Sequence, residues 1–193
     1  MAGFLAEPAT TDDVRRLHAE DVDELGYVMN TTRLWSYRPQ VNTDLFALMR
    51  QVVAPVGLDA RKRAVLVAAC ASAYCDAYCA LSWGVRLADA ADADLSAAVL
   101  RGEDTGLDPA ERALAGWARA VARDPNRTTA ADVQPLRDAG FTDADIFAIT
   151  VFVALRLAFS TVNDALGARP DAELAAAAPA AVRAAVTFGR PPG

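Results

Sequence analysis

The sequence has little of the residue types from which many enzyme sites are built. It contains one histidine and three cysteines in 193 residues. The histidine, His18, lies in a charged segment beside Glu20 and Asp21, which is typical of a solvated surface position. Any Cys–His or Ser–His mechanism would have to use this single residue. No metal site or cofactor is predicted, because the cysteines have no histidine near them and because nucleotide-binding, zincin and nucleophile-elbow patterns are absent.

Basic residues are also few relative to acidic ones. The formal net charge is -6, and the densest basic cluster is only Arg61 to Arg63, so a nucleic-acid partner is not expected. An odd number of cysteines argues against a secreted disulfide framework. The first residues lack the long apolar core of a signal peptide, and the apolar run ITVFVALRLAF is interrupted by Arg156. We therefore expect a cytoplasmic protein without a membrane-spanning segment.

What the sequence does contain is alanine and other helix-favouring residues. Apolar residues make up 53% and charged residues 23%, which is the balance of a soluble globular domain. No segment alternates between apolar and polar residues for long enough to predict a strand. Helix starts are well marked: Asp108 precedes Pro109 and Glu111, and Thr142 precedes a long apolar helix that ends at Gly167. We predict an all-α fold of about eight to ten helices in a single domain, residues 1–193.

One helical segment, residues 66–87, holds all three cysteines. On a continuous helix Cys75 and Cys79 share one face, with Cα atoms about 6.2 Å apart, near the upper end of the disulfide range. Cys70 is turned about 140° away from Cys75 and is expected to pack as a small apolar group. A redox pair is one interpretation of this spacing. Three buried structural cysteines are the other, since free cysteine is among the most buried residue types.

A bend near residues 72–74 would change this picture. It would place Cys75 in the first turn of a second helix, where the helix dipole lowers a thiol pKa. The neighbouring Asp76 would act in the opposite direction, because a carboxylate destabilises a nearby thiolate.

The order of these segments resembles the carboxymuconolactone decarboxylase/AhpD-like alkyl hydroperoxidase superfamily, in particular its peroxidase-related branch. The resemblance rests on GYVMNTTRLWSYRPQVNTDLFALM, on Tyr78–Cys79, and on the stretch from LDPAERALAGWARAV to the closing NDALG. It covers residues 26–170, preceded by an arm and short helix (1–25) and followed by a helix and tail (171–193). The resemblance implies an AhpD-like helical domain that forms a homo-oligomer, either a dimer, a trimer or a hexamer.

The family's catalytic motif is only partly present. AhpD-like peroxidases use two cysteines in a C-x-x-C motif, a following histidine and an upstream glutamate. Cys79 matches the second cysteine, Asp76 stands in place of the first with Cys75 displaced by one residue, and Trp83 stands at the histidine position. The glutamate position falls in residues 61–64, which contain no acid.

Three functions therefore remain open. The first is an AhpD-like thiol oxidoreductase acting on peroxides or disulfides through Cys79 and Cys75, weakened or altered by the missing relay residues. The second is a non-redox carboxymuconolactone decarboxylase-like enzyme or small-molecule binder, with Asp76, Tyr78 and Trp83 lining its pocket. The third is a catalytically silent homologue on the same scaffold.

Overall fold

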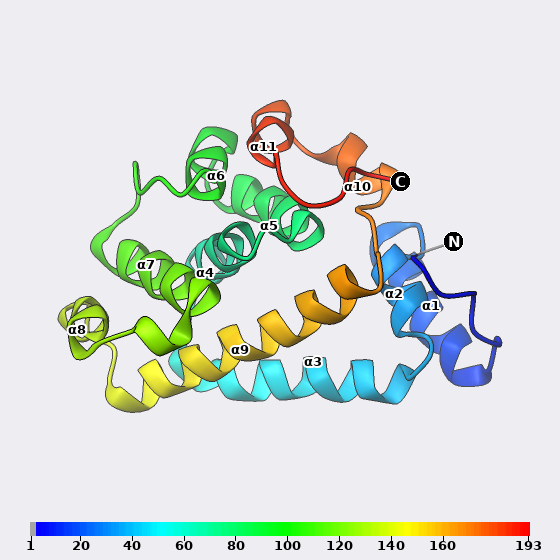
Figure 1. The fold of residues 1–193 in the computed structure, drawn as a ribbon, viewed down its shortest axis with the longest axis horizontal. Helices are drawn as coiled ribbons and strands as arrows, with labels where there is room; N and C mark the ends of the chain where they lie inside the picture. The colour runs from blue at the N-terminus through cyan, green and yellow to red at the C-terminus, as the bar shows by residue number, and fades with distance from the viewer. Residues whose placement is uncertain (1–2) are drawn as a thin grey trace.

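The computed structural model describes residues 3–193, and these form α-helices joined by short loops and two short 3-10 helices (Figure 1). Eight of the α-helices have eight or more residues, and three six-residue helices bring the described total to eleven, so the predicted all-α fold is confirmed. The helices are α1 (Asp12–Leu25), α2 (Asn30–Trp35), α3 (Pro39–Val53), α4 (Ala60–Ala73), α5 (Ala77–Ala90), α6 (Ala93–Leu100), α7 (Pro109–Arg123), α8 (Ala130–Asp138), α9 (Asp143–Ala165), α10 (Ala172–Ala177) and α11 (Ala180–Ala185).

Local capping chemistry sets where several helices begin. Asp108 accepts a hydrogen bond from the Glu111 backbone N–H, and the Glu111 side chain accepts one from the Asp108 backbone. Thr142 and Asp145 form the same reciprocal box at the start of α9. Each box satisfies backbone donors that a helix start leaves free. Both helix starts lie where the sequence predicts them.

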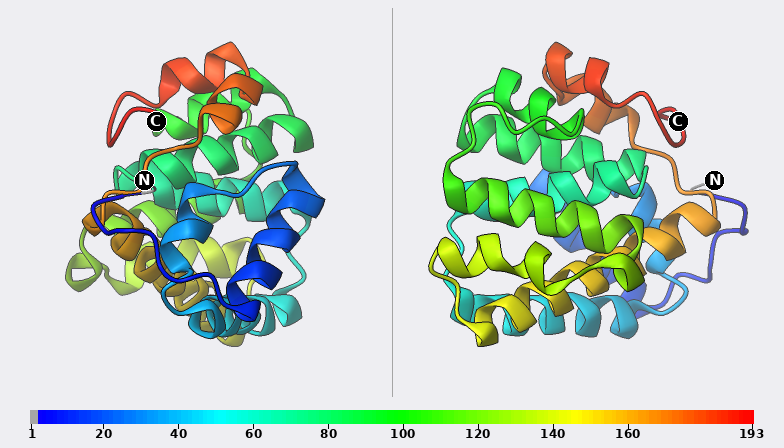
Figure 2. Two further views of the ribbon diagram at one scale, coloured as in Figure 1. Left: turned by 90° about the vertical axis from the view of Figure 1, so that its right-hand side faces the viewer. Right: turned by 60° about the vertical axis from the view of Figure 1, so that its left-hand side comes forward.

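Helix α4 is the centre of the domain. Eight consecutive residues, 64–71, are buried, and the helix packs most extensively against α5 and α7 (Figure 2). Its side chains are small and apolar on every side, so neighbouring helices can approach from several directions. The same need for close approach explains Gly84 in α5, where an added Cβ would lie 2.7 Å from Val182 and 2.9 Å from Leu100.

Helix α9 lies alongside α3 at the edge of the domain, as Figures 1 and 2 show. By length and composition α9 could cross a membrane, but in this fold it packs against α3, α4 and α7 as part of the domain. It leaves Phe147 72% exposed, and α3 leaves Val41 and Leu48 exposed. The cytoplasmic location and the homo-oligomer remain predictions.

The chain ends beside the cysteine segment. Pro179 separates α10 from α11, and the tail after α11 then crosses the start of α5 (Figure 1). Gly189 lies so close that an added Cβ would be 2.9 Å from both the Ala77 nitrogen and the Cys75 oxygen. The tail therefore covers the start of α5, the helix that carries Cys79, while Cys75 just before it stays exposed.

Candidate active site

A tight junction between α4 and α5 positions the cysteines. The Cys75 N–H donates to the Ser72 carbonyl (3.1 Å) and the Asp76 N–H donates to the Ala71 carbonyl (3.0 Å). These two bonds are those of a Schellman motif, in which the residue after the C-cap adopts a left-handed conformation. Cys75 occupies that position with φ 61°, and it is the one non-glycine residue with positive φ in the described chain.

This junction corrects the sequence-based geometry of the cysteine pair. Cys75 and Cys79 do not share a helix, because α4 ends at Ala73 and α5 begins at Ala77. The bend exists, but it is Cys79, and not Cys75, that lies in the first turn of the second helix. Cys75 is exposed and Cys79 is buried, and all three cysteines are free thiols. The structure thus separates the two thiols by environment, and their role as a redox pair remains a prediction.

Asp76 holds the first turn of α5 in place. Its Oδ1 accepts a hydrogen bond from the Cys79 backbone N–H at 2.9 Å, so it is the N-cap residue of the helix. The same residue closes α4 through its own backbone N–H, as described above. Asp76 is fully buried, and its other carboxylate oxygen has no partner within the described residues.

The thiol of Cys79 faces an arginine from α9. Arg156 Nη2 lies 3.3 Å from Cys79 Sγ, and the Ser160 hydroxyl lies 3.7 Å from it. Arg156 is only 6% exposed. Asn163 and Asp164, about two turns further along α9, are polar residues that could serve as partners for this buried charge. Among the described residues, however, Arg156 forms no ion pair, and its hydrogen-bond partner is the sulfur.

Two aromatic rings complete the surroundings of the arginine. The Arg156 guanidinium carbon lies 5.3 Å from the Trp83 ring centre and 5.4 Å from that of Phe159. Arg86 contacts the same Trp83 ring at 5.1 Å. Cation–π contacts of this kind help a buried guanidinium to remain charged without a carboxylate.

Opposing influences act on the Cys79 thiol. Burial raises its pKa most strongly, the Asp76 carboxylate raises it further, and the Arg156 charge lowers it. Cys70, on α4, responds to the same two charges, and burial raises its pKa to about 12. In this closed arrangement both buried thiols are protonated at neutral pH. Formation of a thiolate at Cys79 therefore depends on Arg156 and on any access of solvent to the site.

The site has unused hydrogen-bonding capacity. Four buried side-chain atoms in the described residues lack partners, and three of them lie on Asp76 and on α9: Asp76 Oδ2, Arg156 Nε and Asn163 Nδ2. Asn163 is held from the other side, because its Oδ1 accepts a hydrogen bond from the Trp35 indole at 2.8 Å. Buried polar atoms are rarely left unsatisfied. Two of these atoms belong to Asp76 and Arg156, the residues that contact Cys79, and they have hydrogen-bonding capacity left.

A second carboxyl group lies near this cluster on α9. Burial, and next the charge of Asp76, raise the pKa of Asp164 to about 7, while Arg190 lowers it. Asp164 is thus poised to exchange a proton near neutral pH. The sequence alone singles out neither Ser160 as a neighbour of the Cys79 thiol nor Asp164 as a group that exchanges a proton near neutral pH. Their spacing from Arg156 on a helix, four and eight residues, is the signal that could have found them.

The remaining sequence-predicted residues differ in their surroundings. Tyr78 is buried, and its hydroxyl donates to the Asp171 carboxylate, which also accepts the Asn30 backbone N–H. It ties α5 to α2 and to the start of α10. Trp83 is half-buried between the two arginines. His18 lies on α1, with its Nε2 2.9 Å from the Ser36 hydroxyl. That Asp76, Tyr78 and Trp83 line a substrate pocket remains a prediction.

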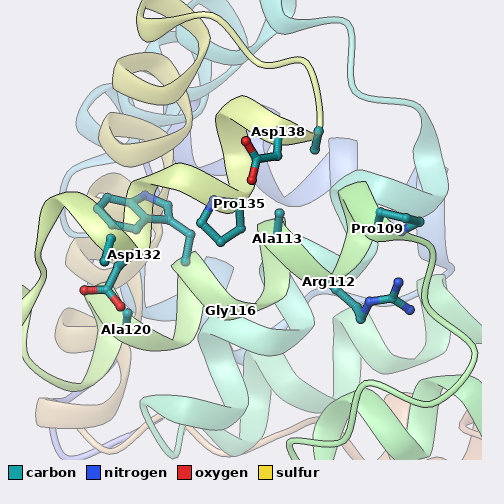
Figure 3. A pocket seen from close by; sticks show the side chains of 11 residues that line it. Pro109, Arg112, Ala113, Gly116, Ala120, Asp132, Pro135 and Asp138 are labelled. Carbon is teal, nitrogen blue, oxygen red and sulfur yellow. The ribbon is translucent and has the colours of Figure 1, made fainter.

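A cavity of about 530 Å³ lies elsewhere, between α7 and α8 (Figure 3). Arg112, Asp132 and Asp138 line it together with small residues of α7, and no cysteine does. A smaller cavity of about 250 Å³ lies among α1, α2 and α3 and reaches Arg86 and Phe159. The smaller cavity is therefore the one adjacent to the residues around Arg156.

No group of three or more potential metal ligands occurs in residues 3–193.

Several solved structures have a fold similar to that of this chain. The fold superposes on an AhpD-core, peroxidase-related protein from Ralstonia eutropha JMP134 with a TM-score of 0.77, at 25% identity over 90% of this chain and 95% of that one. The chain therefore has the fold of the AhpD-like superfamily. A peroxidase-related protein from Silicibacter sp. TM1040 gives a TM-score of 0.76 at 20% identity, over 90% of this chain and 94% of that one.

Another solved structure with a similar fold is that of a debrominase. A cysteine-to-alanine variant of the debrominase Bmp8, in complex with 2,3,4-tribromopyrrole, gives a TM-score of 0.71 at 16% identity, over 90% of this chain and 95% of that one. At this identity the match shows the shared fold alone. No family model and no curated protein sequence matches the chain.

Proposed function

We propose that this AhpD-like protein is a thiol oxidoreductase in which Cys79 is the reacting residue. The observation that supports the proposal is the 3.3 Å contact between Arg156 Nη2 and Cys79 Sγ. A buried cysteine that serves only as packing has no need of a charged donor, which costs free energy to bury. A guanidinium at this distance favours the thiolate, and the thiolate is the form that reacts.

The reaction is that of a thiol with a hydroperoxide. The sulfur of Cys79 attacks one peroxide oxygen, the O–O bond breaks, and the departing oxygen takes the thiol proton and leaves as an alcohol or water. Cys79 becomes a sulfenic acid. The Arg156 charge stabilises the thiolate before attack. The unpartnered atoms of Asp76 and Asn163 are available to bind a polar molecule as small as a hydroperoxide.

Cys75 is the proposed second thiol. Its attack on the sulfenic sulfur forms an S–S bond and releases water. Because Cys75 is exposed and Cys79 is buried, this step requires residues 74–79 to rearrange. The left-handed conformation of Cys75 makes this junction the most strained part of the segment, since a residue with a Cβ is disfavoured there.

Thiol titration before and after one equivalent of peroxide tests the proposal. The wild type is compared with Cys75→Ser and Cys79→Ser. We expect the wild type to lose two thiols per chain. We expect Cys75→Ser to form a sulfenic acid that a dimedone probe traps at Cys79. Unchanged thiols in the wild type under native conditions would refute the proposal.

A second candidate function comes from the structural match to a debrominase. The same buried cysteine and aromatic rings would then act on a small halogenated aromatic compound. Binding of 2,3,4-tribromopyrrole to the Cys79→Ala variant, measured by calorimetry, tests this candidate. Binding combined with inert thiols would favour it over peroxide reduction.

A further inference from the structure

We propose that the cavity among α1, α2 and α3 binds a small zwitterion with an apolar side group, of the aromatic α-amino acid type. The proposal is independent of the thiol chemistry at Cys79. The cavity measures about 250 Å³. Sites for drug-sized ligands run from roughly 300 to 1,000 Å³, so the occupant is smaller than those.

Opposite charges line the cavity without pairing. Glu20, Asp21 and Glu24 come from α1, whereas Arg50 comes from α3 and Arg86 from α5. Within the described residues, no ion pair joins any of these acids to either arginine. The segregation of acids and arginines onto different helices leaves an acidic side for an ammonium group and a basic side for a carboxylate.

Two buried polar side chains face the same space. Asn42 is 8% exposed and Thr32 is 7% exposed, and both line the cavity. Neither side chain makes a hydrogen bond to another described residue, and because their polar atoms are not fully buried they stay accessible to a ligand. An amide and a hydroxyl with free capacity can donate to and accept from a polar ligand.

The apolar part of the cavity is aromatic. Phe46 and Phe159 line it and meet edge-to-face, with ring centres 5.2 Å apart. Trp35 stacks on the other side of Phe159 at 5.4 Å, which fixes that ring in place. A ligand ring can therefore pack against a rigid apolar surface while its charged end lies among the acids and arginines.

The fluorescence of Trp83 should report binding in this cavity. Cys79, Trp83 and Arg86 lie at positions i, i+4 and i+7 of α5, so they share one face of the helix. Arg86 contacts the Trp83 ring. A ligand carboxylate that draws Arg86 toward the cavity changes the surroundings of Trp83, and hence its fluorescence.

Calorimetry with L-phenylalanine as the probe tests the inference. We expect saturable binding to the wild type and to Cys79→Ser. We expect at least tenfold weaker binding of N-acetyl-L-phenylalanine, which lacks the ammonium group, and of L-phenylalaninamide, which lacks the carboxylate. Indole fluorescence should change on binding, and the change should be absent in Trp83→Phe.

Charge-removing variants locate the site. Arg86→Gln and the double variant Glu20→Gln/Glu24→Gln should each weaken binding at least tenfold. All three side chains are exposed, so folding should be preserved. Arg63→Gln, an exposed arginine outside the cavity, is the matched control and should bind like the wild type. Absence of phenylalanine binding, equal binding of either derivative, or unchanged affinity in the charge variants would overturn the inference. None of these outcomes depends on whether Cys79 reacts with peroxide.

Discussion

Arg156 of α9 reaches the sulfur of Cys79 across 77 residues of sequence, at 3.3 Å from Nη2 to Sγ. The contact joins a positive charge to a thiol whose pKa is otherwise raised by burial and by Asp76. The reactivity of Cys79 therefore depends on the balance between one arginine and one carboxylate.

Removing the arginine should make the thiol less reactive. In Arg156→Gln the pKa of Cys79 rises, because the charge that stabilised the thiolate is gone, and we expect alkylation of Cys79 to slow by about tenfold at pH 8. The measurement is the iodoacetamide rate in a Cys70→Ser/Cys75→Ser background. Arg156→Lys keeps the charge and should retain part of the rate. Equal rates in all three proteins would show that Arg156 does not act on the thiol.

Removing the carboxylate should do the opposite. Asn is as good an N-cap residue as Asp, so Asp76→Asn should keep the first turn of α5 while removing the negative charge beside the sulfur. The pKa of Cys79 should then fall, and its alkylation should accelerate roughly threefold or more. Asp76→Ala separates the two roles, since it should also cost about 1 kcal/mol in the free energy of unfolding. A slower reaction in Asp76→Asn would contradict the assignment.

The strained junction predicts a stabilising substitution. Because Cys75 has φ 61°, Cys75→Gly should raise the free energy of unfolding by about 1 kcal/mol in urea denaturation. Cys75→Ala serves as the control, since it removes the thiol but keeps the Cβ, and it should bring no gain. Equal stability of the two variants would mean that the left-handed conformation is not costly here.

Asp164 should make stability depend on pH. Its pKa is raised to about 7 in the fold from an ordinary value of 3.8, so the folded state binds a proton more tightly than the unfolded chain does. Stability should therefore fall as pH rises from about 4 to 7 and stay lowered above that. Asp164→Asn should raise Tm by about 3 °C at pH 8 and by much less at pH 4. The same gain at both pH values would contradict this linkage.

Tyr78 should matter for stability and not for the thiol. Tyr78→Phe removes the buried hydrogen bond to Asp171 and leaves that carboxylate one partner short. We expect a loss of about 1–3 kcal/mol in the free energy of unfolding. The alkylation rate of Cys79 should be unchanged. A large change in that rate would mean that Tyr78 does act on the Cys79 thiol.

The positions of the helices were largely predictable because short local sequence motifs determine where helices begin and end. Asp108 with Glu111 and Thr142 with Asp145 lie three residues apart, and each pair sets a helix start by itself. The interruption at Pro179 is local in the same way. Such signals need no knowledge of distant residues.

The site was predictable only in part. Cys79 and Asp76 stand out by their positions in the cysteine segment, but the partner of Cys79 comes from a helix that begins more than sixty residues later. The start of α5 was misplaced for a different reason. The left-handed residue that follows a helix is most often glycine. Here it is Cys75, so the usual sequence signal for the end of a helix is missing. Asp76 followed by Ala–Tyr–Cys is the cap signal that marks the restart.

Because Asp76 both closes α4 and opens α5, the linker between the two helices contains no spare residue. Inserting a single residue after Cys75 would advance α5 by one step, a rotation of about 100° about its own axis. Cys79 would then turn away from Arg156, and Gly84 would no longer face Val182. The interval of three residues between Cys75 and Cys79 is thus set by the turn that ends one helix and starts the next. A chain can preserve this interval for the sake of its architecture, even where the two sulfurs never meet.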